Sequence, residues 1–249
     1  MTIWRLELIR LFRTLRWAGL LASYLAFGIL GPLITRYQEE IFRSVGGGLT
    51  IQAPPPTPGL AFTAYLGNAS QIGVIVTVFI AAGSLAFDAK PEWAAFLRTR
   101  ARSLGDLVVP KVAVMTAAAS ASFALGTVAA WVGTTLLIDD VPAGAMLAGT
   151  LAWTLYLAFA VSVVALAAGL SRSVVGAAGP TVVVLLVLPV VAEVFPAVRQ
   201  WAPSTLVGAI VEMVDGRSAT DFARAAAVSV GLSAGALWGS MRLLARREV

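Results

Sequence analysis

The sequence is dominated by long stretches that contain no charged side chain. There are six of these stretches, and they cover residues 17–35, 44–87, 112–138, 141–171, 173–192 and 225–241. A helix crosses a bilayer with about 20 mostly apolar residues, and one Arg, Lys or Asp at its centre costs roughly 2.5–3.5 kcal/mol on insertion scales. We therefore expect six membrane-spanning helices and an all-α, polytopic membrane protein.

The composition excludes several other classes of protein. Only 12% of the 249 residues are charged, whereas an ordinary soluble domain has roughly a quarter. The absence of His and Cys excludes a zinc, haem or iron–sulfur site built from those ligands, and catalysis by an imidazole or a thiolate. The net charge of +5 fits membrane orientation better than nucleic acid, because the basic residues do not form a cluster with aromatic residues.

Residues 44–87 are long enough for two helices, but their first part cannot be helical. It contains three consecutive glycines, Gly46 to Gly48, and the proline-rich run from Pro54 to Pro58, which cannot propagate a helix against lipid. We therefore expect a loop over 36–64. The expected spans, in a single permease domain of residues 1–249, are 17–35, 65–87, 110–137, 144–170, 174–194 and 225–243.

The distribution of basic residues predicts the orientation. With a cytoplasmic N-terminus, 13 of the 18 Lys and Arg residues lie in the inner connections and flanks and five lie outside. Basic residues in short loops favour the cytoplasmic side. Both termini are therefore expected to be cytoplasmic.

Residues 2–16 are predicted to form an amphipathic helix before the first span. Its basic residues lie on one side, and its apolar face is formed by Trp4, Leu8, Leu11, Phe12 and Leu15. This pattern is typical of a helix that lies flat in the headgroup region of a membrane. The alternative is a charged flank of the first span with no separate role.

The loop between the second and third spans contains a short apolar ridge surrounded by basic residues. Trp93, Phe96 and Leu97 are spaced so that they share one helical face, and Arg98, Arg100 and Arg102 surround them. A ridge this small cannot form a core of its own. It either lies against lipid headgroups or docks into a groove of a partner.

The connection over 195–224 contains a charge-free piece from Trp201 to Val211. Ser204 or Thr205 could cap a short helix that starts after Pro203 and ends near Asp215. Because such a helix is too short to cross, we expect it to re-enter the membrane from the outer side.

Small residues recur every four positions in the last span, as Gly231, Gly235 and Gly239 preceded by Ala227. This spacing lets two helix backbones approach closely in lipid. We expect packing within the same chain rather than across a dimer interface.

A nucleotide-binding loop of the form GxxxxGK[ST] is missing, because neither lysine, Lys90 or Lys111, follows a glycine. We therefore do not expect this chain to be an enzyme. If ATP drives the protein, another chain must hold the ATP and its Mg²⁺.

Together these features resemble the permease subunits of ABC-2 type bacterial ABC transporters. That family has six spans with both ends inside, an elbow helix before span one, a coupling helix between spans two and three, and short outer helices between spans five and six. Its loop after span two matches here at Asp88, at Phe96-Leu97 and at Lys111. The family's Gly-Thr is replaced by nearby Glu92-Trp93, and Arg100 to Ser103 resemble its turn only loosely.

The resemblance implies the membrane half of an ATP-driven exporter in the bacterial cytoplasmic membrane. Two permease subunits, identical or different, would pair, and ATPase subunits would bind a coupling helix over 92–102. The residues implied in ATPase coupling are Asp88, Glu92, Trp93, Phe96, Leu97, Arg98, Arg100 and Arg102.

The cargo and two other functions remain open at the level of sequence. Spans without a central charge argue against an ion-coupled carrier and are compatible with a drug, antibiotic or lipid-like cargo. One alternative is a membrane scaffold or sensor that recruits a cytoplasmic partner through residues 88–111. The other is a membrane enzyme, which would have to use Asp139-Asp140 or Glu212 and Asp215, all in expected outer loops.

Overall fold

The computed structural model describes residues 2–45, 54–86 and 103–246, and within these ranges the regular structure is entirely helical. Six helices are long and apolar enough to cross a membrane, as predicted. They are α2 (Arg16–Val45), the continuous unit α3 (Pro58–Asn68), η1 (Ala69–Gly73) and α4 (Val74–Leu85), then α6 (Leu104–Leu137), α7 (Ala143–Leu170), α8 (Val174–Val194) and α11 (Ala223–Ala245).

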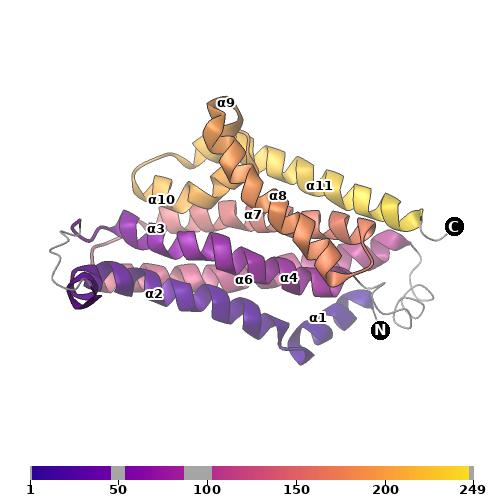
Figure 1. Cartoon of the computed structure of the whole chain (residues 1–249), viewed down its shortest axis with the longest axis horizontal. Coiled ribbons are helices and arrows are strands. Elements are labelled where there is room, and N and C mark those ends of the chain that lie inside the picture. Colours follow the sequence, from indigo (N-terminus) through magenta and orange to yellow (C-terminus); the bar gives the residue numbers. More distant parts are fainter. Residues whose placement is uncertain (1, 46–53, 87–102, 247–249) are drawn as a thin grey trace.

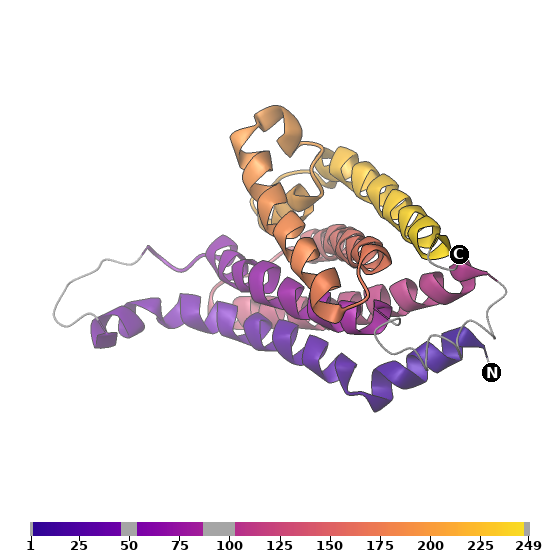
Figure 2. The ribbon, with the colours of Figure 1, turned by 45° about the vertical axis from the view of Figure 1, so that its right-hand side comes forward.

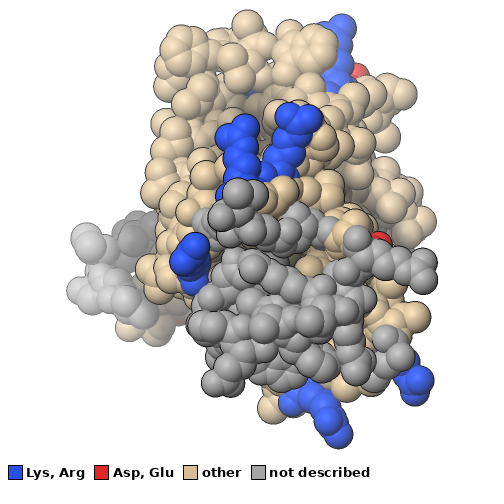
Figure 3. Space-filling view, turned by 90° about the vertical axis from the view of Figure 1, so that its right-hand side faces the viewer, with Lys and Arg blue, Asp and Glu red and all other residues tan. Residues whose placement is uncertain are grey.

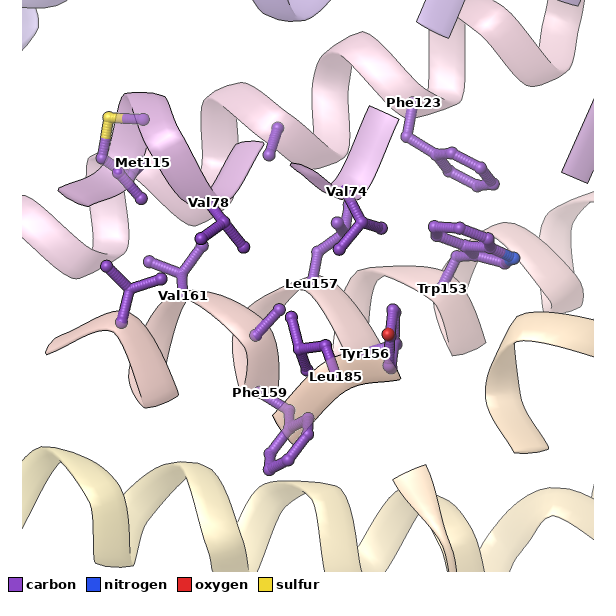
Figure 4. Close-up of a cluster of buried hydrophobic side chains, with 14 of the residues drawn as sticks. Val74, Val78, Met115, Phe123, Trp153, Tyr156, Leu157, Phe159, Val161 and Leu185 are labelled. Atoms are coloured by element: carbon purple, nitrogen blue, oxygen red, sulfur yellow. The ribbon is translucent and has the colours of Figure 1, made fainter. Parts of the chain in front are cut away.

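Helix α7 is the centre of the bundle, with contacts to α4, α6, α8 and α11 (Figures 1 and 2). Its core contains Trp153, which is fully buried and stacks on Phe123 of α6 with a distance of 4.3 Å between the ring centroids. Tyr156 and Leu157 continue the buried row along α7 (Figure 4). The aromatic pair thus joins the middle of α6 to the middle of α7.

Helices α2 and α6 cross so closely that only glycine fits. A Cβ atom on Gly28 would lie 2.1 Å from the carbonyl oxygen of Gly126, and one on Gly126 would lie 2.6 Å from that of Tyr24. Small residues allow this kind of backbone approach in membranes. The glycine crossing of the fold is therefore in α2 and α6, where the sequence analysis did not place it.

The second span contains a single π-helical turn, η1, between α3 and α4. At its end Gly73 leaves room for the ring of Tyr24, because a Cβ there would lie 2.5 Å from that ring. The Tyr24 hydroxyl also lies 2.9 Å from the hydroxyl of Thr77. The π turn is therefore packed directly against α2.

The prediction of a loop over 36–64 is wrong at both ends. Helix α2 continues to Val45, and its last turns are polar, with an ion pair of 2.6 Å between Arg43 and Glu39. Helix α3 begins at Pro58, a residue that suits the first turn, and the Thr57 hydroxyl accepts a hydrogen bond from the Leu60 amide. The predicted span ended at the first charged residue, Arg36, but a helix can continue beyond its apolar part.

The third span also begins earlier than predicted, at Leu104 instead of 110. Ser103 and Asp106 form a reciprocal capping box, which satisfies two free amide groups of the first turn. Helices α7 and α8 agree with the predicted 144–170 and 174–194 to within one residue, and α11 is two residues longer at each end than the predicted 225–243.

The described ends of the chain lie at the same end of the bundle (Figures 1 and 2). We call this the α1 end; it holds α1 (Ile3–Arg13), Leu85 at the end of α4, Ser103 and Ala245. Among the described residues, the charged side chains visible on this end are mainly Lys and Arg (Figure 3). Its position on the cytoplasmic side remains a prediction.

Candidate functional site

The helix predicted over residues 2–16 is present as α1, Ile3–Arg13, and most of its predicted apolar face is exposed. Trp4, Leu8 and Phe12 are 49%, 46% and 59% exposed, and Leu15, in the turn that follows, is also exposed. Leu11 instead packs in the core. An exposed apolar row beside basic residues is what a membrane-surface helix requires, and the location of α1 at such a surface stays a prediction.

The buried side of α1, formed by Glu7 and Leu11, carries a charge pair that was not predicted from the sequence. The Lys111 ammonium of α6 donates to the Glu7 carboxylate, and both side chains are almost completely buried. Removing one partner of such a pair typically costs about 3–5 kcal/mol, because the other charge is left buried and uncompensated. Glu7 and Lys111 are therefore tightly linked although 104 residues separate them.

Two arginines extend this pair into a network at the α1 end. Arg10 lies 3.9 Å from Glu7, and the Arg16 guanidinium donates to the carbonyl oxygen of Gly83 at 3.1 Å. Gly83 lies in the last turn of α4. The N-terminal region is thus bonded to the end of α4 and to the start of α6.

The turn between α1 and α2 is held in an unusual backbone conformation. Leu15 has a φ of 52° and is the one non-glycine residue with positive φ in the described chain. A bulky residue in this region costs of order 1–3 kcal/mol and persists only where the surrounding contacts fix it. The angle between α1 and α2 is therefore set by packing rather than by a flexible glycine.

The predicted coupling helix, 92–102, and its eight coupling residues lie outside the described residues. The structure describes the elements that flank this stretch, from Leu85 and Ala86 on one side to Ser103 on the other. One residue of each contact described above belongs to a flanking helix. Gly83, which accepts from Arg16, is in α4, and Lys111, which donates to Glu7, is in α6.

At the other end of the bundle, four short helices form the connection between α8 and α11. They are α9 (Pro196–Arg199), η3 (Pro203–Gly208), α10 (Ala209–Val214) and η4 (Ala219–Phe222). The Trp153 indole of α7 donates to the Val207 carbonyl at 2.9 Å. A Cβ on Gly149 would lie 2.4 Å from the side chain of Ile210. The segment is therefore packed tightly against α7.

The predicted bounds of the short outer helix agree with η3 and α10, which run from Pro203 to Val214, but the predicted cap is wrong. Ala202 occupies the N-cap position and makes no side-chain cap. The Thr205 hydroxyl donates instead to the Arg199 carbonyl, and the Ser204 hydroxyl is buried without a hydrogen-bond partner. This helix therefore begins at Pro203 without the predicted side-chain cap.

Of the carboxylates considered for an enzyme, Glu212 is paired with arginines, and Asp139, Asp140 and Asp215 are exposed. Glu212 accepts a hydrogen bond from Arg217, which raises the pKa of Arg217 above its ordinary value, and it also pairs with Arg199 at 3.5 Å. Asp139 and Asp140 are exposed in the turn between α6 and α7. The described residues contain no group of three or more metal-binding side chains.

The glycine row of α11 is only partly used within the chain. A Cβ on Gly239 would lie 2.9 Å from Leu166 of α7, whereas Gly231 and Gly235 are exposed and have open space around them. The expectation that all three glycines pack within the same chain is therefore wrong for Gly231 and Gly235. The contact with α7 instead uses Ser240, whose hydroxyl donates to the Ala165 carbonyl at 2.7 Å.

A small cavity lies between the second span and α8. Its lining is apolar except for Ser70, whose hydroxyl already donates to the Gly67 carbonyl. The lining residues are Ser70, Val74, Ile75, Val78, Val182, Leu185 and Leu186. No charged side chain contributes to this cavity.

One signal in the sequence could have drawn attention to Glu7. It is the only acidic residue before Glu39, and it lies among four arginines. The identity of its partner could not be read from the sequence, because a contact between α1 and α6 depends on the tertiary fold.

Six apolar helices fit a multi-pass membrane protein. Comparison of the chain with protein-family models, curated proteins and solved structures finds no match. The functional assignment therefore rests on the sequence and the geometry described above.

Proposed function

We propose that this protein is the membrane-spanning permease subunit of an ATP-driven exporter of the ABC-2 type, which works in a bacterial cytoplasmic membrane with a second permease subunit and a separate ATPase. The observation that supports this most is the order of helices along the chain. A short amphipathic helix precedes six apolar helices, and short helices packed between α8 and α11 lie at the end opposite α1.

The pairing of the buried Lys111 charge and the apolar lining of the cavity support an amphiphilic or hydrophobic cargo. Lys111, which is fully buried, is paired with Glu7 near the start of α6. The cavity beside α8 is lined by apolar side chains. A charged cargo would need compensating charges along its path, so we propose a drug-like or lipid-like molecule that enters from the bilayer.

Co-purification with an ATPase tests the proposal. The full chain is expressed with any protein from a neighbouring gene whose sequence contains GxxxxGK[ST], and the complex is isolated and assayed for ATP hydrolysis. We expect a stable complex, and we expect Trp93→Ala with Phe96→Ala to weaken it, because these side chains are the proposed anchors in the ATPase groove.

Trp201→Ala is the matched control, since Trp201 is an exposed tryptophan in the connection between α8 and α11. It should leave the complex intact. If no ATPase binds and another cytoplasmic protein is retained through residues 88–111, the scaffold or sensor function replaces the exporter.

A further inference from the structure

Two contacts tie the N-terminal region to the elements on either side of residues 87–102. Arg16 at the start of α2 donates to Gly83 in the last turn of α4. Glu7 of α1 accepts from Lys111 near the start of α6. Trp4, Leu8 and Phe12, the row available for membrane anchoring, are exposed and take part in neither contact.

The burial of Glu7 is unusual for a helix that lies on a membrane surface. Such a helix directs its charged side chains toward water, yet Glu7 is 3% exposed and its partner Lys111 is fully buried. Within the N-terminal 38 residues no other carboxylate side chain could replace Glu7. The single acidic residue of α1 is therefore used to bind α6.

The left-handed Leu15 is a second, independent observation. A leucine adopts this conformation at a measurable cost, and it does so only where neighbouring contacts determine the backbone. Here the contacts of α1 with α6 on one side and of α2 with α6 on the other fix the position of the turn. Helix α1 is therefore held at a defined angle.

We propose that Glu7, Lys111 and Arg16 are positioning residues that fix α1, through Glu7, to α6 and the adjoining start of α2, through Arg16, to the end of α4, so that these helix ends move as one body. The functional consequence rests on the proposed exporter function. Movement that an ATPase imposes on the ends of α4 and α6 would reach α1 and, through its exposed apolar row, the membrane surface.

The test measures the position of α1 in the full chain. Spin labels are attached at Arg5→Cys on α1 and Val109→Cys on α6, both exposed positions in a chain without native cysteine. Electron paramagnetic resonance then gives the distribution of distances between them in lipid nanodiscs. In complexes with the ATPase, the amount of cargo exported per ATP hydrolysed is measured in parallel.

We expect Glu7→Gln to broaden the distance distribution, because the neutral amide no longer holds the Lys111 charge. Exported cargo per ATP should fall about tenfold, within the range of coupling changes seen for residues that touch neither ligand. The exchanged pair, Glu7→Lys with Lys111→Glu, should restore both readouts. A residue with a merely structural role would lower export and hydrolysis together.

Two further variants keep the test decisive. Glu7→Gln with Lys111→Met removes both buried charges, so the chain can fold without an unpaired ion, and it too should broaden the distribution. Glu39→Gln removes one partner of the exposed Arg43 pair at the opposite end and should change nothing.

An unchanged distance distribution in both Glu7 variants would overturn the proposal, whatever happens to export. A broadened distribution with unchanged export per ATP would also overturn it, because α1 would be attached without positioning anything. If the wild-type chain binds no ATPase, the exporter function fails, and the distance measurement alone decides whether the charge pair positions α1.

Discussion

At the scale of single residues, backbone contact between helices depends on where glycines face each other. Gly28 and Gly126 allow the carbonyls of α2 and α6 to approach, while Gly231 and Gly235 of α11 meet nothing in the described chain. Spacing in the sequence revealed the α11 row but not the crossing pair, because spacing within one helix contains no information about the helix opposite.

We predict opposite effects for the same substitution at these two places. Gly126→Ala should lower stability by about 1–3 kcal/mol, because its methyl group would force α2 and α6 apart. Gly231→Ala should leave stability unchanged or raise it by up to about 1 kcal/mol through higher helix propensity. Thermal unfolding in detergent micelles measures both, and equal effects would contradict the close crossing.

At the scale of elements, the spans could be predicted and their ends often could not. Charge-free runs located all six apolar helices, since membranes exclude unpaired charge. The charge-free runs did not predict the polar end of α2, because that part is helical although it contains charged residues. They also gave no indication that Thr57 caps the start of α3. The packing of η3 and α10 on α7 depends on Trp153, which no local pattern connects to Val207.

The segment of η3 and α10 should loosen when its hydrogen bond to α7 is removed. A cysteine at Ser204→Cys would be shielded in the parent chain, because the Ser204 hydroxyl is buried. Trp153→Phe keeps an aromatic ring but lacks the indole donor for Val207, so maleimide labelling should become severalfold faster. The label rate at exposed Asp140→Cys should not change, and a constant rate at Ser204→Cys would show that the segment is held by other contacts.

At the scale of the whole molecule, both described chain ends share one end of the bundle, as an even number of membrane-spanning helices predicts. The excess of basic residues predicts that this end is cytoplasmic. The Glu7–Lys111 pair at that end was beyond the reach of sequence reasoning, because a separation of 104 residues can be closed only by the fold. Overall architecture is thus more predictable here than the contacts that fix α1.

Accessibility in intact cells tests the orientation. Asp140→Cys and Arg246→Cys are both exposed positions at opposite ends of the bundle. A membrane-impermeant maleimide should label Asp140→Cys in intact cells and Arg246→Cys only after lysis. The reverse pattern would place α1 outside and remove the basis for a cytoplasmic ATPase.

The π turn gives the second span a property that its composition does not reveal. Its buried side chains advance by four residues, then by five across η1, then by four again, as Ala61, Tyr65, Ala69, Val74, Val78 and Ala82. Because a π turn closes with five residues where an α-helical turn closes with four, the longer step brings Val74 to about the position that a four-residue step would reach in a regular α-helix. The π turn is therefore the place where this span can lose a residue: deleting Ile72 should give a regular α-helical turn and leave accumulation in the membrane unchanged, whereas deleting Phe79, which is equally exposed but lies in the regular helix α4, should rotate the residues that follow by about 100° and reduce it. Loss of accumulation on deletion of Ile72 would contradict this role of η1.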